Sequence, residues 1–288
     1  MTRIYLSFPA GPNLPVAPGE WNEQFQNQFS NILRLYFNQL SGLLRELGNT
    51  QGGYHLNFPY GAFHQDGVTT LSASISNVST TPISVASTES FPASGWILIG
   101  GEIIQYTSKT ATTFDGTVTR GVLGTTNVAH TAGAAISEVQ GTGSPTTIGQ
   151  VLFNNTDYSN GIYTQATDLS KVYFDKDGIY NIQISVQLLN FTTTDDNVTM
   201  WFVLNGNDIA NTASIEQVNA KHGGDPGASI LTFNIFQRIR GGDYIQLKWA
   251  SNTGNTVVAT YPAGTSPVHP VSPAIILTAS FVSSSVDQ

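Results

Sequence analysis

Histidine and acidic side chains are the residues of this chain best suited to metal binding or acid–base chemistry, and both are widely scattered. The five histidines are more than four residues apart, so no two can hold one ion from the same helical face. They are His55, His64, His130, His222 and His269. Asp195-Asp196 follows three threonines and could attract Ca²⁺, but a solvated acidic turn explains it more simply. The sequence predicts no metal site.

Other chemistry-bearing patterns are missing. There is no cysteine and no Gly-x-Ser-x-Gly elbow. The glycine pairs Gly100-Gly101 and Gly241-Gly242 lack the spacing of a phosphate-binding loop and indicate tight turns. A glycosidase needs two placed carboxylates, and acids are sparse, so a polysaccharide depolymerase stays only as an alternative. We expect no enzymatic activity and no cofactor.

The composition narrows the class of partner. Charged residues make up 10 % of the chain, against the roughly 25 % usual for soluble domains. The net charge is −8, and no run of Lys or Arg occurs, so we expect no binding to nucleic acid. No apolar run is long enough to span a bilayer, so we expect no membrane insertion. With 30 aromatic residues (15 Phe, 11 Tyr and 4 Trp), the chain is expected to fold.

The first 20 residues predict an extended strip. Four prolines at positions 9, 12, 15 and 18 forbid a helix here. Such a strip cannot satisfy its own backbone, so it is either a flexible tail or a peptide that lies along another protein. Tyr5, Leu6 and Phe8 favour the second interpretation and are the predicted anchor residues.

Residues 21–47 predict one long helix, with Gly48 as its C-terminal cap. Two apolar stripes run along it, which is more than a helix lying on a single surface needs. One stripe has coiled-coil spacing and is the predicted interface between copies of the chain. Its residues are Leu33, Phe37, Leu40, Leu44 and Leu47. The alternative is that the helix packs on its own domain.

The remainder predicts β structure. Residues 180–188 alternate strictly between apolar and polar, which is typical of a half-buried antiparallel strand. Asn205-Gly206 predicts a tight hairpin. Together, these patterns divide the chain into an anchor strip and helix (1–50), a linker with a first strand (51–71), a separate small β module (72–140) and a β sandwich or jelly roll (141–288).

Several short motifs follow one another over residues 147–282. They are Val172-Tyr173-Phe174-Asp175, Gly178-Ile179-Tyr180-Asn181-Ile182, Met200-Trp201, Gly242-Asp243-Tyr244-Ile245-Gln246-Leu247 with Trp249, and Pro273-Ala274-Ile275-Ile276-Leu277-Thr278. In this order they resemble the trimeric jelly rolls of the tumour-necrosis-factor and complement globular-head type found in bacteriophage structural proteins. Residues 60–66 look like the first strand of such a domain, which implies a jelly-roll sandwich with residues 72–140 inserted between its first and second strands.

A second resemblance concerns the insert. Its residues are Phe91-Pro92 with Gly95, Gly101-Glu102, Tyr106, Phe114, Arg120-Gly121, Gly124-Thr125-Thr126, His130 and Gly133-Ala134. Together they are similar to the pattern of a small β module recurrent in phage tail and virion proteins. We expect Glu102 and Arg120 to lie inside this module as a pair.

The resemblances imply a structural protein of the virion, assembled in the host cytoplasm. The leading hypothesis is a homotrimeric tail fibre or spike that is held to other virion proteins by residues 1–50 and serves in host adsorption. A capsid decoration protein or head fibre is the alternative within that class, and a carbohydrate-binding module is the alternative outside it. A host-surface glycan or protein would be a further partner, and the sequence assigns no receptor-binding residues.

Overall fold

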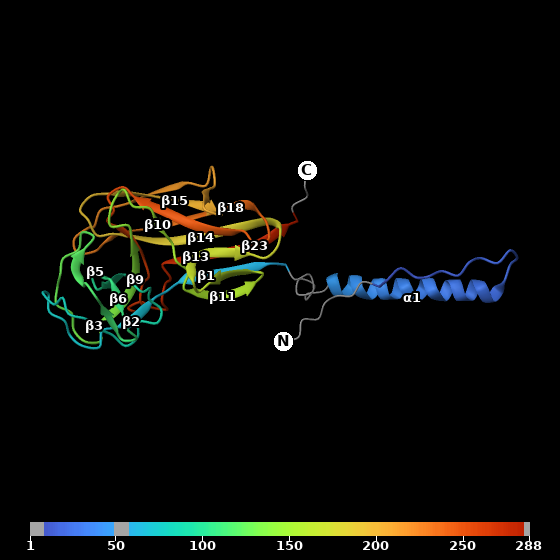
Figure 1. Ribbon diagram of the computed structural model, residues 1–288, viewed down its shortest axis with the longest axis horizontal. Helices are drawn as coiled ribbons and strands as arrows, with labels where there is room; N and C mark the ends of the chain where they lie inside the picture. Colours follow the sequence, from blue (N-terminus) through green and yellow to red (C-terminus); the bar gives the residue numbers. More distant parts are fainter. Residues whose placement is uncertain (1–8, 49–57, 285–288) are drawn as a thin grey trace. The chain divides into compact units, whose positions relative to one another are not determined.

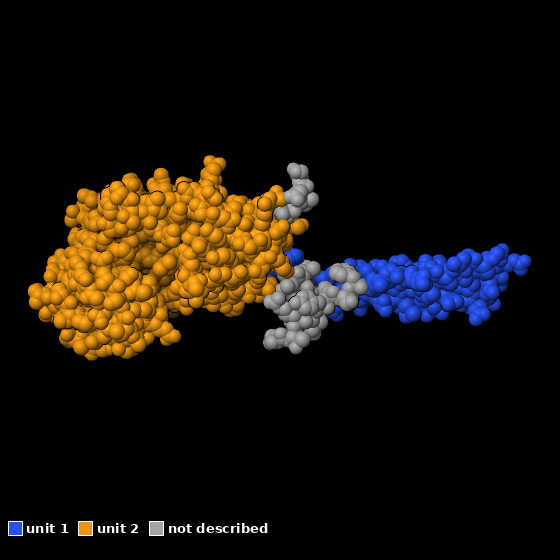
Figure 2. Space-filling view, viewed as in Figure 1, with its two compact units in different colours: residues 1–58 blue, residues 59–288 orange. Residues whose placement is uncertain are grey.

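The computed structural model describes residues 9–48 and 58–284, and the chain divides into the units Met1–Phe58 and Pro59–Gln288 (Figure 2). Each unit is described here by itself. The predicted anchor residues Tyr5, Leu6 and Phe8 lie outside the described residues.

The first unit contains one helix among its described residues, α1 (Glu23–Gly48), close to the predicted span of 21–47. Asn22 caps its start, because the Asn22 side-chain oxygen accepts a hydrogen bond of 2.9 Å from the Phe25 N–H. Glu23 in the first turn and Arg45 in the last complement the helix dipole. No described helix is both long and apolar enough to cross a membrane.

The two apolar stripes of α1 differ in exposure. Phe25, Phe29, Ile32 and Tyr36 are half-buried, and Leu43 of the same stripe is buried. In the stripe predicted to join copies of the chain, Phe37 and Leu44 are more than half exposed. The other three residues of that stripe are half-buried: Leu33, Leu40 and Leu47. Figure 1 shows the described residues before α1, 9–22, running along the helix.

The second unit is built on two antiparallel sheets packed face to face (Figure 1). The first sheet has eleven strands, and in its jelly-roll part the order is β11-β1-β23-β14-β18. The strands of this part are β1 (Tyr60–Gln65), β11 (Asn155–Asn160), β14 (Gly178–Asn190), β18 (Gly227–Ile239) and β23 (Ile275–Ser283). The second has the order β12-β13-β19-β15, with β10 on β19 and with β16 and β17 on β15. Its strands are β10 (Gly149–Gln150), β12 (Ile162–Gln165), β13 (Asp168–Phe174), β15 (Asp196–Leu204), β16 (Asn207–Asp208), β17 (Ser214–Val218) and β19 (Tyr244–Ser251).

This strand order confirms the predicted fold class, mainly β with a jelly-roll sandwich. In β14 the even-numbered apolar side chains from Tyr180 to Leu188 are buried, as the alternation in the sequence predicted. Asn205 and Gly206 both have positive φ (50° and 84°), the conformation of a two-residue hairpin turn. One apolar core, to which Phe63, Phe202 and Trp249 belong, fills the space between the sheets.

The segment between β1 and β10 forms a small β module. Its strands are β2 (Val68–Thr70), β3 (Ile83–Ser84), β4 (Gly95–Ile99), β5 (Glu102–Tyr106), β6 (Ser108–Lys109), β7 (Thr113–Asp115), β8 (Thr119–Val122) and β9 (Ala135–Gly141). Phe91, Tyr106 and Phe114 pack ring against ring in its own core, with centroids 4.6 to 4.9 Å apart. Three of the aromatic positions in the predicted module pattern are therefore core residues.

The module is continuous with the jelly roll. β9 pairs with β4 on one side and with β20 (Thr256–Ala259) on the other, and β20 pairs with the end of β14 beyond β23. The predicted boundary at residue 140 thus falls inside β9. A third apolar cluster joins both parts, with Leu98, Ile103 and Val139 from the module, and Leu189, Phe191, Val257 and Ala259 from the jelly roll. The short hairpin of β21 (Gly264–Thr265) and β22 (Val268–His269) follows β20.

Candidate ligand-binding site

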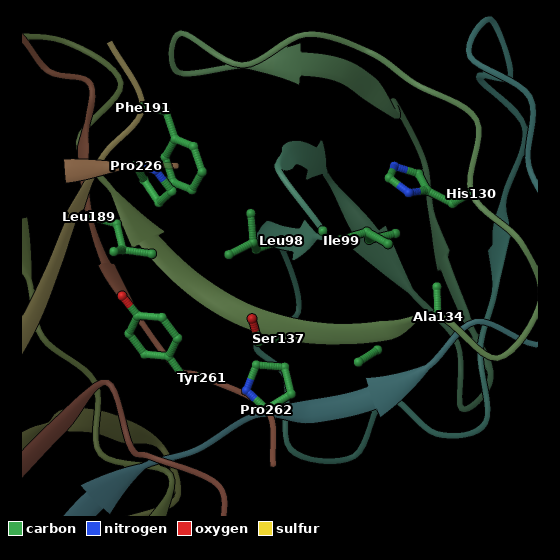
Figure 3. Close-up of a pocket in the computed structure, with 12 residues that line it drawn as sticks. Leu98, Ile99, His130, Ala134, Ser137, Leu189, Phe191, Pro226, Tyr261 and Pro262 are labelled. Carbon is green, nitrogen blue, oxygen red and sulfur yellow. The ribbon is translucent and has the colours of Figure 1, made fainter. Parts of the chain in front are cut away.

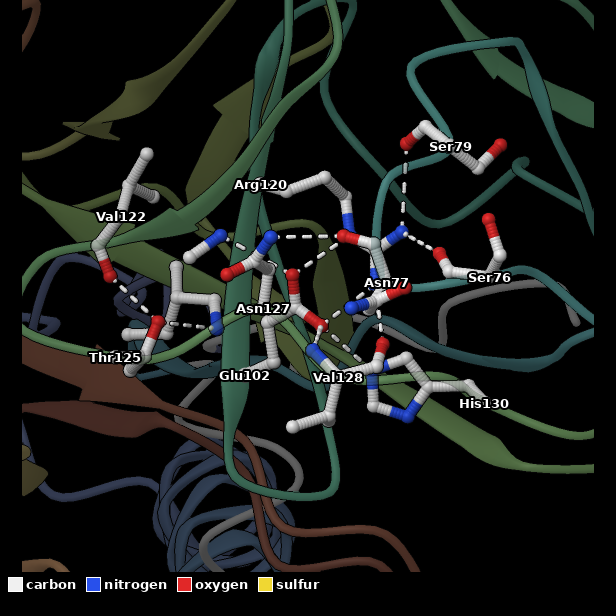
Figure 4. A network of polar contacts seen from close by, with 12 residues as sticks. Ser76, Asn77, Ser79, Glu102, Arg120, Val122, Thr125, Asn127, Val128 and His130 are labelled. Atoms are coloured by element: carbon white, nitrogen blue, oxygen red, sulfur yellow. Dashed lines mark hydrogen bonds and ion pairs between the residues drawn. The ribbon is translucent and has the colours of Figure 1, made fainter.

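Glu102, at the start of β5, is the centre of a buried polar network (Figure 4). Arg120 donates to both carboxylate oxygens, from Nε to Oε1 at 2.6 Å and from Nη2 to Oε2 at 2.7 Å. The backbone N–H groups of Gly121 and Val128 donate to the same carboxylate, each at 3.1 Å. Nε2 of His130 lies 2.8 Å from Oε2, and because a carboxylate only accepts, that nitrogen carries the proton. Glu102 therefore has five donors around it.

The network also fixes the surrounding loops. Arg120 donates to the carbonyl oxygens of Ser76, Ser79 and Val128. Gly121 has a φ of +61°, and a side chain there would bring a Cβ to 2.8 Å from the Asn127 nitrogen, so the loop requires glycine. The residues of the module pattern thus hold its loops together.

Burial would raise the pKa of the Glu102 carboxyl, but hydrogen bonds from Arg120, Val128 and His130 hold that pKa below its ordinary value. The side chains of Glu102 and Arg120 are 0 % and 4 % exposed. The predicted pairing of Glu102 with Arg120 is confirmed. Because every carboxylate oxygen already has its partners, this arrangement stabilises the module and leaves no free base for chemistry.

His130 connects the network to a cavity of about 450 Å³ at the junction of the module and the jelly roll (Figure 3). The module contributes Leu98, Ile99, Gly100, His130, Ala134, Ala135 and Ser137, and the jelly roll contributes Leu189, Phe191, Pro226, Tyr261 and Pro262. The walls are mostly aliphatic, aromatic and proline carbon. The cavity lies beside the apolar cluster shared by the two parts, since Leu98, Leu189 and Phe191 belong to both.

Two hydroxyl groups interrupt these apolar walls. Ser137 Oγ is buried and has no hydrogen-bond partner among the described residues. The half-buried Tyr261 joins the sheet through its backbone, which pairs with Ser272. Burial raises the pKa of the Tyr261 phenol, so that hydroxyl is neutral at physiological pH. Figure 3 shows the Ser137 hydroxyl pointing among Leu98, Leu189 and Tyr261.

A second buried acid, Glu138, follows Ser137 on β9. Its Oε2 has no hydrogen-bond partner in the described structure, and its side chain faces Gly67 so closely that a Cβ there would lie 2.5 Å from that oxygen. Burial raises the pKa of the Glu138 carboxyl to about 8, against the opposing influence of Gln65 and Lys109. Glu138 is therefore largely protonated at neutral pH.

Asp196 corrects one prediction. It does not belong to a solvated acidic turn, because it is 2 % exposed and accepts hydrogen bonds from Ser251 Oγ, Thr256 Oγ1 and Thr253 N. Burial opposes ionisation, yet these donors keep the pKa of Asp196 below its ordinary value. Within the described ranges, no group of three or more His, Asp or Glu side chains is placed to hold a metal ion.

The predicted and observed sites overlap only in part. The sequence singled out Glu102, Arg120 and His130, and the structure brings these three together. It did not single out Ser137, Glu138 or Tyr261, which no motif marks. The polar pair Ser137-Glu138 inside β9, a strand that is buried on both faces, is the one sequence signal that could have pointed to the first two.

Comparison with known proteins identifies no family for this chain. No protein-family model matches this sequence, and no curated protein matches it. Among solved structures, the chain is similar to the crystal structure of murine APRIL at pH 5.0, with 13 % identity and a TM-score of 0.32. The match covers 48 % of this chain and 95 % of that chain. The assignment of a jelly roll accordingly rests on the strand order itself.

Proposed function

We propose that this protein is a homotrimeric structural subunit of a bacteriophage particle, a tail fibre or spike whose N-terminal unit attaches to the virion and whose β unit serves in host adsorption. The observation that supports self-association most directly is the solvent-facing side of the first sheet. There Ile230, Phe236, Ile276 and Val282 are exposed, by 41 to 64 %.

The part of this face formed by β14, β18 and β23 is almost without charge. Between these apolar residues, β14 presents Asn181, Gln183, Ser185 and Gln187, and β23 presents Thr278 and Ser280. Arg238 is the one charged residue at the outward positions of β14, β18 and β23, all of which the structure describes. A second copy packing here would bury apolar area with little cost of charge desolvation. Exposed Phe37 and Leu44 on α1 offer a second contact between copies.

Light scattering tests the trimer. The full chain should give about three times its 30.8 kDa. Phe236→Glu should shift the oligomer toward the monomer, because it places a charge in the proposed interface. Val78→Glu is the matched control, since Val78 is 75 % exposed in the module and lies outside the proposed interface. A clean monomer at micromolar concentration would refute this part of the proposal.

The proposed attachment to the virion is tested with a shortened chain that lacks residues 1–20. The shortened protein should fold and trimerise but fail to incorporate into virions, and particles without the protein should keep their genome yet adsorb poorly. Normal loading of the shortened chain would place the anchor elsewhere. Normal adsorption with heads that break under osmotic shock would instead favour a capsid decoration protein.

A further inference from the structure

We infer that the cavity between the β module and the jelly roll binds a small uncharged organic molecule with an apolar body and one hydroxyl group. This site goes beyond the structural role proposed above and does not depend on it.

The size of the cavity is the first argument. A space of about 450 Å³ falls within the 300–1,000 Å³ typical of small-molecule sites. It also lies where two separately cored parts of the chain meet, which is a common position for such sites.

The lining determines the charge of the ligand. No Lys, Arg, Asp or Glu is among the described residues that form the walls. His130 is the one wall residue with a basic group, and its Nε2 is engaged by the Glu102 carboxylate. Tyr261 is the other titratable wall residue, and it is neutral. A charged ligand would lose its hydration and find no free counter-charge, so the cavity favours an uncharged one.

The polar groups determine where a ligand hydroxyl would go. The Tyr261 hydroxyl and Ser137 Oγ both belong to residues of the cavity wall, and no hydrogen-bond partner in the described structure satisfies Ser137 Oγ. A hydroxyl donates one hydrogen bond and accepts two, so one ligand hydroxyl can serve both groups. Rotation about the Cα–Cβ bond of Ser137 gives its oxygen three staggered positions from which to meet the ligand.

Calorimetric titration of the full chain with 1-octanol tests the inference. We expect saturable binding of one octanol per chain, and octanoate and octylamine should bind at least about 10-fold more weakly. Ala135→Phe should weaken octanol binding at least about 10-fold, because Ala135 lines the cavity and a phenyl ring would fill it. Ala132→Phe is the matched control, since Ala132 is an exposed neighbour outside the lining.

The hydroxyl contact is tested separately. Tyr261→Phe and Ser137→Ala should each weaken octanol binding about 2- to 10-fold, the range expected for one hydrogen bond. Ser137→Ala should also raise the melting temperature of the ligand-free protein, because it removes an unsatisfied buried hydroxyl. Absence of saturable binding, or octanol affinity unchanged in Ala135→Phe, would overturn the inference. So would binding seen only after the oligomer is dissociated, since a second copy would then cover the cavity.

Discussion

Replacing Glu102 with glutamine should destabilise the β unit strongly. All five groups that surround the carboxylate are donors, so the new amide nitrogen must face at least one of them. Arg120, with only 4 % of its side chain exposed, would keep its charge without a counter-ion. Removal of one partner of a buried pair typically costs about 3–5 kcal/mol. For a unit of this size that corresponds to a fall in melting temperature of roughly 6–20 °C.

Scanning calorimetry at neutral pH measures this effect directly. Glu89→Gln is the matched control, because it makes the same chemical change at an exposed carboxyl of the same module. The double variant Glu102→Leu/Arg120→Met should recover part of the loss, since it removes both charges together. If the Glu102→Gln protein has the same melting temperature as the wild type and the control, the conclusion that this network stabilises the module is refuted.

The pH dependence of the same residue has a definite sign. The Glu102 pKa is lower in the folded protein than the ordinary 4.5, so the unfolded chain binds the proton more tightly. The free energy of unfolding that Glu102 contributes is therefore complete above about pH 4.5 and is lost as the pH falls toward the folded pKa. Acid unfolding curves of the wild type should be steeper below pH 4.5 than those of Glu102→Gln. Parallel curves would contradict the assignment.

Three further predictions concern other buried groups. Because the Glu138 pKa is raised to about 8, wild-type stability should fall as pH rises from about 4.5 to 8, and Glu138→Gln should remove that decline in urea unfolding; an unchanged slope would count against it. Asp196→Asn should cost only about 1–3 kcal/mol in the same assay, because the hydroxyls of Ser251 and Thr256 can turn to accept from an amide; loss of the fold would contradict this. Deletion of residues 72–140 should leave a jelly roll that melts cooperatively in calorimetry but at a lower temperature, since Leu189, Phe191, Val257 and Ala259 lose their cover; non-cooperative melting would show that the module is required for folding.

The elements with local signals were predictable from sequence. The alternation in β14, the hairpin at Asn205-Gly206 and the long helix each depend on residues close together in the chain, and each appears where expected. The pairing of Glu102 with Arg120 was predictable through the pattern of the module.

Features assembled from distant segments were not predictable in this way. The hydrogen-bond donors to buried Asp196, Ser251 and Thr256, lie 55 to 60 residues further along the chain. Nothing in the local sequence Asp195-Asp196 indicates that these residues meet. The cavity needs β4, β9, the end of β14 and the segment after β20 to meet, so no single stretch of sequence carries its signature.

The position of β1 determines how the β unit responds to mechanical load. β1 begins at Tyr60, pairs with β11 along its length and meets β23 at its end, and then enters the module through Gly67 and β2. The Phe281 N–H adds a hydrogen bond of 3.0 Å to the Pro59 carbonyl just before β1. If the chain is pulled before Pro59 while the module is held, the force runs along the strand and across its hydrogen bonds. Those bonds are then loaded in shear and must break together. The sheet therefore resists a force applied from this side more strongly than a force that would break its hydrogen bonds one at a time.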